Sequence, residues 1–412
     1  MSKGNIIMSL IVACILVGGG AAYYVTIQNE GGTSGDLRDM ADRAVTPVDN
    51  LDNGVVTVGV GTLRWASYFG LYEDIICVDL GDTNAGGYNA KGYGYAFDYY
   101  LKAANGTVKT HSHNSIEAAD VENIGEMDPS IVIISLSVYE SYKVNCDLLA
   151  AKCNVVVIDE LEDFLDASEY RLNDRFVKQI DLLGKVLGKE ARANELKSGI
   201  QSVLDDIRGI VKDMTSDKKV YVCGVSSSGA KSLDFGLPEY WALELANGTN
   251  IMSMISDKRG VTSMQLNVEE IAKLNPDIVF VDPTCKNMLT GTDSQNVMEA
   301  IIKSGSKIYV STPYVWFGIN YDNVLADTYR LINNLYGDSV IDQAAVDSKI
   351  DSVYKLFYGD DGSDVRVNMI KFFENTFMPD GENVVKAKGV PLTIGNEYTI
   401  GGEKGSRELV KV

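Results

Sequence analysis

The sequence contains two versions of one short pattern, DVENIGEMDPSIVII at Asp120–Ile134 and NVEEIAKLNPDIVFV at Asn267–Val281. Each begins with helical periodicity, passes through a proline that ends the helix, and finishes in an apolar run typical of a buried strand. The copies lie about 150 residues apart, too far for a solenoid repeat. They therefore predict two similar lobes, each built around its own sheet, and a cleft between lobes is a common ligand site. Aligned without gaps, the copies share Val121/Val268, Glu122/Glu269, Ile124/Ile271, Pro129/Pro276, Ile131/Ile278 and Val132/Val279.

The size and composition indicate a folded protein with more than one core. The chain has 412 residues, 45% of them hydrophobic, and only 8 prolines. This length exceeds that of one typical domain, and the high apolar and low proline content excludes a disordered chain. The formal net charge of −20 excludes a nucleic-acid-binding protein, because phosphate binding needs clusters of Lys and Arg.

Strand-like runs alternate with helical segments on both sides of a long helical region, which predicts parallel sheets with right-handed crossovers. Asp166 and Glu169 form the pattern of a capping box at the start of that region. A break at Leu187–Gly188 leaves Lys189–Asp213 as one helix, long enough to join two lobes. The expected strands are Gly54–Val60, Ile75–Val78, Asn154–Ile158, Lys219–Val225 and Lys307–Val310, and the other expected helices include Phe97–Ala104, Tyr139–Lys152, Tyr240–Ala246, Asn323–Tyr336, Ala344–Phe357 and Val367–Phe377, with turn signals after Pro379 that allow a hairpin.

The N-terminus carries the charge-free run Asn5–Ile27, long enough to span a bilayer as a helix. Lys3 precedes it, whereas Glu30 and Asp36 follow it, so the positive-inside bias places the body of the protein outside the cytoplasm. We expect a retained transmembrane anchor. A signal peptide cleaved near its small residues, or a lipoprotein modified at Cys14, are the alternatives.

Neither a disulfide framework nor a resident metal is predicted. The 6 cysteines contain no CxxC pair. His111 and His113 are the only histidines, and no third ligand has suitable spacing, so we expect a plain loop there. Motifs of hydrolases, zinc proteases and nucleotide-binding loops are absent, and the Gly- and Tyr-rich residues 83–107 fit a surface loop.

Four segments in matching order carry a family resemblance. They are LNVEEIAKLNPDIVFVD at Leu266–Asp282, IDLLGKVLGKEA at Ile180–Ala191, KIYVSTPYVWFG at Lys307–Gly318 and NVLADTYRLINNLYG at Asn323–Gly337. Together they resemble the substrate-binding proteins of ABC importers for iron chelates, haem and cobalamin, over about residues 54–340. The first lobe departs from the pattern, since Asp128-Pro129-Ser130 replaces Asn-Pro-Asp.

The resemblance implies an α/β fold of two Rossmann-like lobes, whose mainly parallel sheets are joined by a long helix and preceded here by the N-terminal transmembrane helix. The expected organisation is an anchor or signal segment, a tether, an N-terminal lobe, a helical region, a C-terminal lobe, and C-terminal helices with a tail, at residues 1–28, 29–50, 51–165, 166–216, 217–340 and 341–412.

The resemblance also implies a docking role for one acidic residue on each lobe. In that family such residues bind arginines of the membrane permease. The repeat places Glu122 and Glu269 at equivalent positions, seven residues before the proline, so the role is carried over to both. Carboxylates accept paired hydrogen bonds from arginine, which suits such contacts. Two solvated helix glutamates are the alternative.

Ligands of open parallel sheets bind beyond the carboxyl ends of the strands, where three loops of this chain combine cations, hydroxyls and aromatic rings. Such groups suit an anionic, flat or chelated ligand, although each could instead serve local packing or a turn. The candidate ligand-binding residues are Arg64 and Trp65 in the first loop, Ser227, Ser228 and Lys231 in the second, and Tyr314 and Trp316 in the third.

These features predict a receptor rather than an enzyme. We expect a membrane-anchored, extracytoplasmic protein that captures siderophore-iron, haem or a corrinoid and delivers it to an ABC permease and its ATPase, without a cofactor of its own. A chelatase or nitrogenase-like enzyme on the same fold is one alternative, but only Cys285 lies near a strand end. A surface sensor without a transporter is another.

Overall fold

The computed structural model describes residues 37–83, 106–225, 230–256, 262–375, 379–380, 383–384 and 389–412. All of these belong to one compact unit, Asp36–Val412. The expected N-terminal anchor, the expected helix Phe97–Ala104 and most of the Gly- and Tyr-rich stretch lie outside the described residues. Within the described ranges, no helix combines the length and apolar composition that crossing a membrane requires.

The first sheet has five strands in the order β3-β2-β1-β4-β5. Every neighbouring pair is parallel, as the sequence predicted. The central strands are completely buried, which their Val- and Ile-rich sequences favour in a sheet covered on both faces. The strands are β1 (Val55–Val58), β2 (Ile75–Asp79), β3 (Lys109–His111), β4 (Ile131–Ser135) and β5 (Val155–Ile158), and the helices around them are α1 (Thr62–Tyr68), α4 (Ala118–Met127), α5 (Leu136–Ser141) and α6 (Lys143–Ala150).

The second sheet follows the order β11-β9-β8-β12-β13-β16-β17, with β10 paired to β8. Its core of β8, β12 and β13 is parallel, and the C-terminal hairpin of β16 and β17 adds two antiparallel strands beside β13. The elements are β8 (Lys219–Cys223), β9 (Phe235–Gly236), α9 (Trp241–Leu245), β10 (Thr249–Asn250), β11 (Met264–Gln265), α10 (Val268–Leu274), β12 (Ile278–Val281), α11 (Thr292–Ser304), β13 (Lys307–Val310), β16 (Glu397–Gly401) and β17 (Glu408–Lys411).

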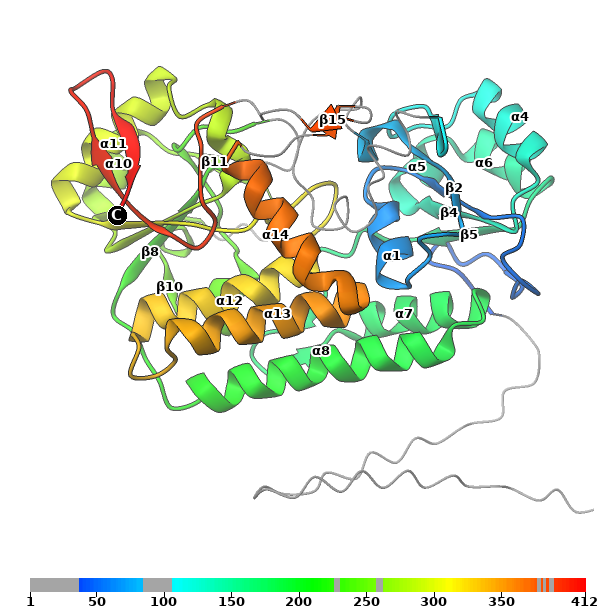
Figure 1. Ribbon diagram of the computed structural model, residues 1–412, viewed down its shortest axis with the longest axis horizontal. Coiled ribbons are helices and arrows are strands. Elements are labelled where there is room, and N and C mark those ends of the chain that lie inside the picture. Colours follow the sequence, from blue (N-terminus) through cyan, green and yellow to red (C-terminus); the bar gives the residue numbers. More distant parts are fainter. Residues whose placement is uncertain are drawn as a thin grey trace, which may run out of the picture. The chain divides into compact units, whose positions relative to one another are not determined.

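The two copies of the repeat occupy equivalent positions in the two sheets. Their strands, β4 and β12, are each flanked by two parallel neighbours. Their helices, α4 and α10, each start with a capping box. Each helix ends at a left-handed residue directly before the proline, Asp128 with φ 48° and Asn275 with φ 49°. Figure 1 shows the helix pair α4 and α6 beside the first sheet, and α10 and α11 beside the second.

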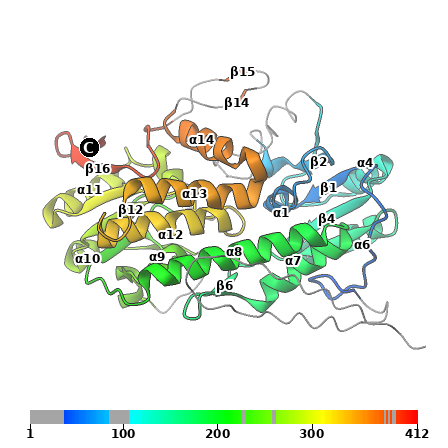
Figure 2. The ribbon, with the colours of Figure 1, turned by 60° about the horizontal axis from the view of Figure 1, so that its bottom comes forward.

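Long helices connect and cover the two sheets. After β5 the chain forms α7 (Asp174–Val186) and α8 (Glu190–Val211), and α8 leads to β8. The 22-residue α8 packs against α7, α12 (Tyr321–Tyr336) and α13 (Gln343–Tyr358). Figure 2 shows α8 running alongside α12 and α13. The prediction of a long connecting helix is confirmed, and its buried face has helical spacing: Ala193, Leu196, Ile200, Leu204, Ile207 and Val211.

Three sequence predictions about helices were wrong in detail. The capping box assigned to Asp166 and Glu169 does not start a helix, because Leu165–Asp166 and Arg171–Leu172 form a two-stranded hairpin. The helix starts only after Asn173, whose side chain accepts the cap hydrogen bond. The helix predicted at 139–152 is divided at Tyr142 into α5 and α6. The last helix, α14, occupies Gly362–Phe373 rather than 367–377, and the backbone leaves the helical conformation at Asn375, with φ 58°.

Tyr321 joins the two lobes at the start of α12. Its side chain is fully buried, and its hydroxyl donates to the carbonyl oxygens of Glu160 and Leu161, each at 3.0 Å. Its ring contacts Phe164 of the first lobe and Phe176 of α7, with centroids 4.9 and 4.8 Å away. The lobes are therefore held by an aromatic core with polar bonds at its edge.

We expect Tyr321→Phe to lower the free energy of unfolding by about 1–2 kcal/mol, because it leaves two buried carbonyl groups without this donor. Tyr336→Phe is the matched control. Its hydroxyl also donates to a carbonyl oxygen, that of Ala246, but it is only half-buried and water can replace it. Urea unfolding measures both, and an equal loss in the two variants would contradict the assignment.

Candidate functional site

Arg64 and Trp65 lie on a helix rather than in the loop that the sequence predicted. Gly61 follows β1 with φ 93°, a conformation open to glycine, so α1 begins directly at Thr62. The Thr62 hydroxyl donates to the Gly59 carbonyl oxygen at 2.6 Å and closes the turn. Both residues therefore project from the first turn of a helix at the carboxyl end of the first sheet.

Arg64 reaches across to the second lobe. Its side chain is 1% exposed. Its guanidinium donates to the Trp316 carbonyl oxygen at 2.9 Å, the Gly318 carbonyl oxygen at 3.1 Å and Asn320 Oδ1 at 3.0 Å. These acceptors follow β13, so the carboxyl ends of β1 and β13 meet at this contact. Arg64 thus occupies the interlobe boundary but is engaged by the protein itself.

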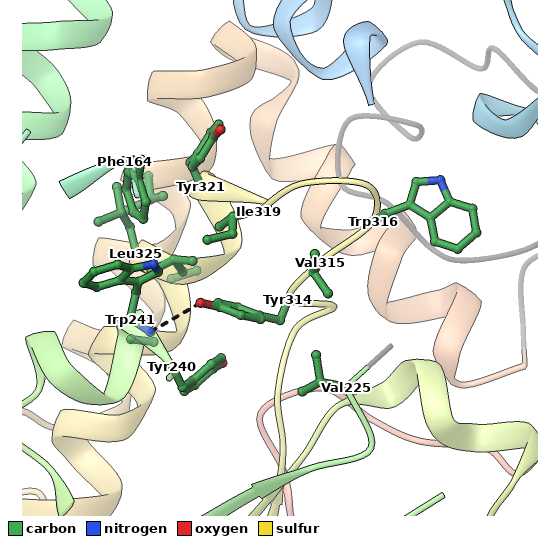
Figure 3. Packing of buried hydrophobic residues seen from close by; sticks show 14 of the residues in the cluster. Phe164, Val225, Tyr240, Trp241, Tyr314, Val315, Trp316, Ile319, Tyr321 and Leu325 are labelled. Atoms are coloured by element: carbon green, nitrogen blue, oxygen red, sulfur yellow. Dashed lines mark hydrogen bonds between the residues drawn. The ribbon is translucent and has the colours of Figure 1, made fainter. Parts of the chain in front are cut away.

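Trp65 and Tyr314 are packed inside the protein. The ring of Trp65 is 2% exposed and lies 5.3 Å from Phe176 and 5.6 Å from Tyr321, measured between centroids. Tyr314 is 1% exposed and lies against Tyr240, 4.6 Å away. Figure 3 shows the Tyr314 hydroxyl directed at the backbone amide of Trp241. Both rings are therefore packed against protein, Trp65 near the boundary and Tyr314 within the second lobe.

Trp316 and Lys231 are the remaining described members of the predicted set. Trp316 points away from the cluster around Tyr314 (Figure 3). The ammonium group of Lys231 lies 5.0 Å from the centroid of the Phe235 ring, a distance at which a cation–π contact forms. Ser227 and Ser228 lie outside the described residues. The structure therefore brings Arg64, Trp65 and Trp316 to one boundary, whereas Tyr314 packs within the second lobe.

The structure adds residues that the sequence analysis did not name. A cavity of about 10 Å³ lies at the boundary, with Arg64, Ser135, Asp159, Glu160 and Phe317 in its lining. A space of this size holds about one water molecule. Asp159 and Glu160 directly follow β5, so their position at a strand end could have revealed them. A larger groove of about 920 Å³ lies elsewhere, against the C-terminal hairpin and α11.

Buried carboxylates shape the electrostatics of the first lobe at this edge. Burial, and then the nearby charge of Asp82, raise the pKa of Asp79 to about 7. Asp79 accepts hydrogen bonds from the backbone amides of Gly81 at 2.7 Å and Asn114 at 2.9 Å. Burial also raises the pKa of Glu160, whose carboxylate accepts a hydrogen bond from Ser137. Backbone amides thus hold the Asp79 carboxylate, with His113 Nδ1 3.9 Å away, whereas a serine hydroxyl holds Glu160.

No metal site forms from the described side chains. Among them, no group of three or more His, Cys, Asp and Glu is placed to hold an ion. His111 is buried with Nε2 2.7 Å from the Thr57 carbonyl oxygen, and burial lowers its pKa. Cys285 is fully buried, and burial raises the pKa of its thiol well above the usual value.

Glu122 and Glu269 are both exposed, on α4 and α10. Glu122 forms an ion pair of 2.7 Å with Lys152, in which the glutamate side chain is 69% exposed. An exposed pair of this kind contributes little to stability and can exchange partners.

The charge of Asp82 is expected to steepen the pH dependence of stability. Because the pKa of Asp79 is raised on folding, the stability that its protonated form contributes is complete below pH 4 and is lost as the pH rises through about 7. Asp82→Asn removes one cause of the raised pKa and keeps an oxygen to accept from the Gly61 amide. Urea unfolding between pH 5 and 8 should show a shallower fall in this variant, and an unchanged slope would refute the coupling.

Comparisons with known proteins agree with this fold. A family model described as periplasmic binding protein matches residues 96–304. The molybdate-binding protein MolA of Haemophilus influenzae, bound to molybdate, is 17% identical with a TM-score of 0.57, over 78% of this chain and 97% of that chain. A periplasmic solute binding protein from Veillonella parvula is 17% identical with a TM-score of 0.55, over 80% and 95%.

An ABC transporter solute binding protein from Sulfurospirillum deleyianum is 16% identical with a TM-score of 0.53, over 78% of this chain and 94% of that chain. No curated protein sequence matches the chain. At these identities the solved structures show the fold alone. The family model, in contrast, spans just over half of the 412 residues. The chain therefore belongs to the periplasmic binding protein family, whose members are extracytoplasmic binding proteins and not enzymes.

Proposed function

We propose that the protein is the solute receptor of an ABC importer, that it binds a metal chelate between its lobes, and that its N-terminal segment holds it at the membrane. One observation carries the proposal. The loops after β1 and β5 meet the loop after β13 at a boundary with exposed and half-buried polar and aromatic groups, which is where ligands of such sheets bind. The chelate would be siderophore-iron, haem or a corrinoid.

The side chains at the boundary favour a chelate over a bare ion. Phe317 and His113 approach edge to face at 6.2 Å, and Trp316 lies 5.3 Å from Phe317. Aromatic rings offer flat apolar surface but no ligand for a metal. A chelate brings its own donor atoms, so the absence of a suitable ligand group among the described residues is compatible with it.

The proposed ligand contacts are those at the open side of the boundary. Lys231 is half-buried and remains a candidate, together with Ser227 and Ser228. Trp316 is only 6% exposed in this structure, so it would contact a ligand only after the boundary opens. The buried groups Arg64, Trp65 and Tyr314 would define the walls, as their packing supports. Since the cavity of about 10 Å³ cannot hold a chelate, binding requires the lobes or the loops between them to move apart.

Binding should be visible as a shift in stability. A ferric siderophore, haemin or cobalamin at 100 times its Kd would stabilise the native state by about 2.7 kcal/mol and raise the melting temperature by a few degrees. The expected result is such a shift for one of the three, with quenching of tryptophan fluorescence. Molybdate is the comparison ligand, and a shift with molybdate alone would contradict the chelate proposal.

Transport should depend on Glu122 and Glu269 through docking rather than through ligand binding. The double variant Glu122→Ala with Glu269→Ala is expected to abolish most uptake by cells and to leave the Kd for the ligand unchanged, because both side chains lie on outer helices. Glu126→Ala, another exposed carboxylate of α4, is the matched control and should transport normally. Normal uptake by the double variant would remove the docking role.

A further inference from the structure

The contact between the lobes is built around a short hairpin that follows β13, which we call the interlobe hairpin, Val315–Ile319. An isolated bridge pairs Val315 with Ile319, and the Trp316 amide donates to the Gly318 carbonyl oxygen at 3.0 Å. Its tip takes positive φ angles, 45° at Phe317 and 121° at Gly318. The tip therefore has a strained conformation that surrounding contacts must maintain.

Arg64 supplies those contacts from the opposite lobe. Its guanidinium donates to the carbonyl oxygens of Trp316, directly before the tip, and Gly318, the second residue of the tip, at 2.9 and 3.1 Å. It also donates to Asn320 Oδ1 from both Nε and one terminal nitrogen, at 3.2 and 3.0 Å. The rigid planar fork of arginine can bind several acceptors at once, whereas a lysine cannot reproduce this geometry.

The backbones on the two sides leave little room for a side chain. A Cβ added at Gly61 would lie 3.0 Å from the Phe317 carbonyl oxygen. One added at Gly318 would lie 3.0 Å from the Glu160 carbonyl oxygen and 3.1 Å from Arg64 Nη1. Both glycines have positive φ, 93° and 121°. The hairpin thus fits closely into the first lobe, with glycine on each surface.

We propose that Arg64 is a positioning residue, which fixes the interlobe hairpin and thereby orients Trp316 and Phe317 at the ligand side of the boundary. The location of the ligand site rests on the proposed function. The contact of Arg64 with the interlobe hairpin does not depend on it. A positioning role explains why a buried arginine lies at the boundary. Its donors bind protein carbonyl groups and do not point to open space.

The orientation of Trp316 can be tested without knowing the ligand. The chain has 3 tryptophans, so protein labelled with 5-fluorotryptophan gives three fluorine resonances, each assignable by a Trp→Phe variant. In Arg64→Gln we expect the Trp316 resonance to shift and broaden and the Trp241 resonance to stay in place. Arg64→Lys, which keeps the charge and one set of donors, should return the Trp316 resonance part of the way.

Hydrogen exchange provides the second readout. Amides of residues 311–322 should exchange at least tenfold faster in Arg64→Gln. Asn320→Ala, which removes one acceptor and with it two hydrogen bonds of Arg64, should act in the same direction and serves if Arg64→Gln does not fold. Arg366→Gln is the matched control, because Arg366 binds Asp347 and Asp351 within the C-terminal helices.

Two results would overturn the proposal. One is that Arg64→Gln leaves both the Trp316 fluorine resonance and the hydrogen exchange of residues 311–322 unchanged. If Arg64→Gln does not fold, the same result in Asn320→Ala counts instead. The other is an equal change in Arg366→Gln, which would indicate a general loss of stability. Neither result depends on ligand binding, so failure of this proposal would not contradict the proposed receptor function.

Discussion

The burial of one arginine between two lobes is the constraint on which the rest of the boundary depends. A guanidinium removed from water must have its donors satisfied, and Arg64 meets this need with acceptors of the facing lobe. Those acceptors are available only if the chain after β13 turns back at Phe317 and Gly318. The same turn leads into α12, where Tyr321 completes the aromatic core between the lobes.

Much of the fold could be predicted from the sequence, because its cause is local. The repeated helix, proline and strand supply one interior strand of each sheet, and both left-handed caps fall at the residue before the proline. The hairpin at 165–172 could not be predicted in this way. Its polar residues match a capping pattern, and only the pairing of Leu165 with Leu172 decides against a helix.

The site was less predictable, for a physical reason. Position beyond a strand identified Arg64, Trp65, Tyr314 and Trp316 as candidates, and a bond from Arg64 to the Trp316 carbonyl oxygen crosses the boundary, whereas Tyr314 packs within its own lobe. Whether such a side chain faces a ligand or the other lobe depends on contacts between residues more than 250 positions apart, as the bond from Arg64 to Asn320 illustrates. Glu160 was missed, although it follows a strand just as the others do.

The central claim is that a small molecule binds between the lobes, and native mass spectrometry of the protein as purified from its own cells tests it most directly. The account predicts a 1:1 complex whose additional mass corresponds to a metal chelate, and release of that mass on unfolding. A protein that carries no ligand, and to which none of the chelates named above adds as a 1:1 complex, would contradict it.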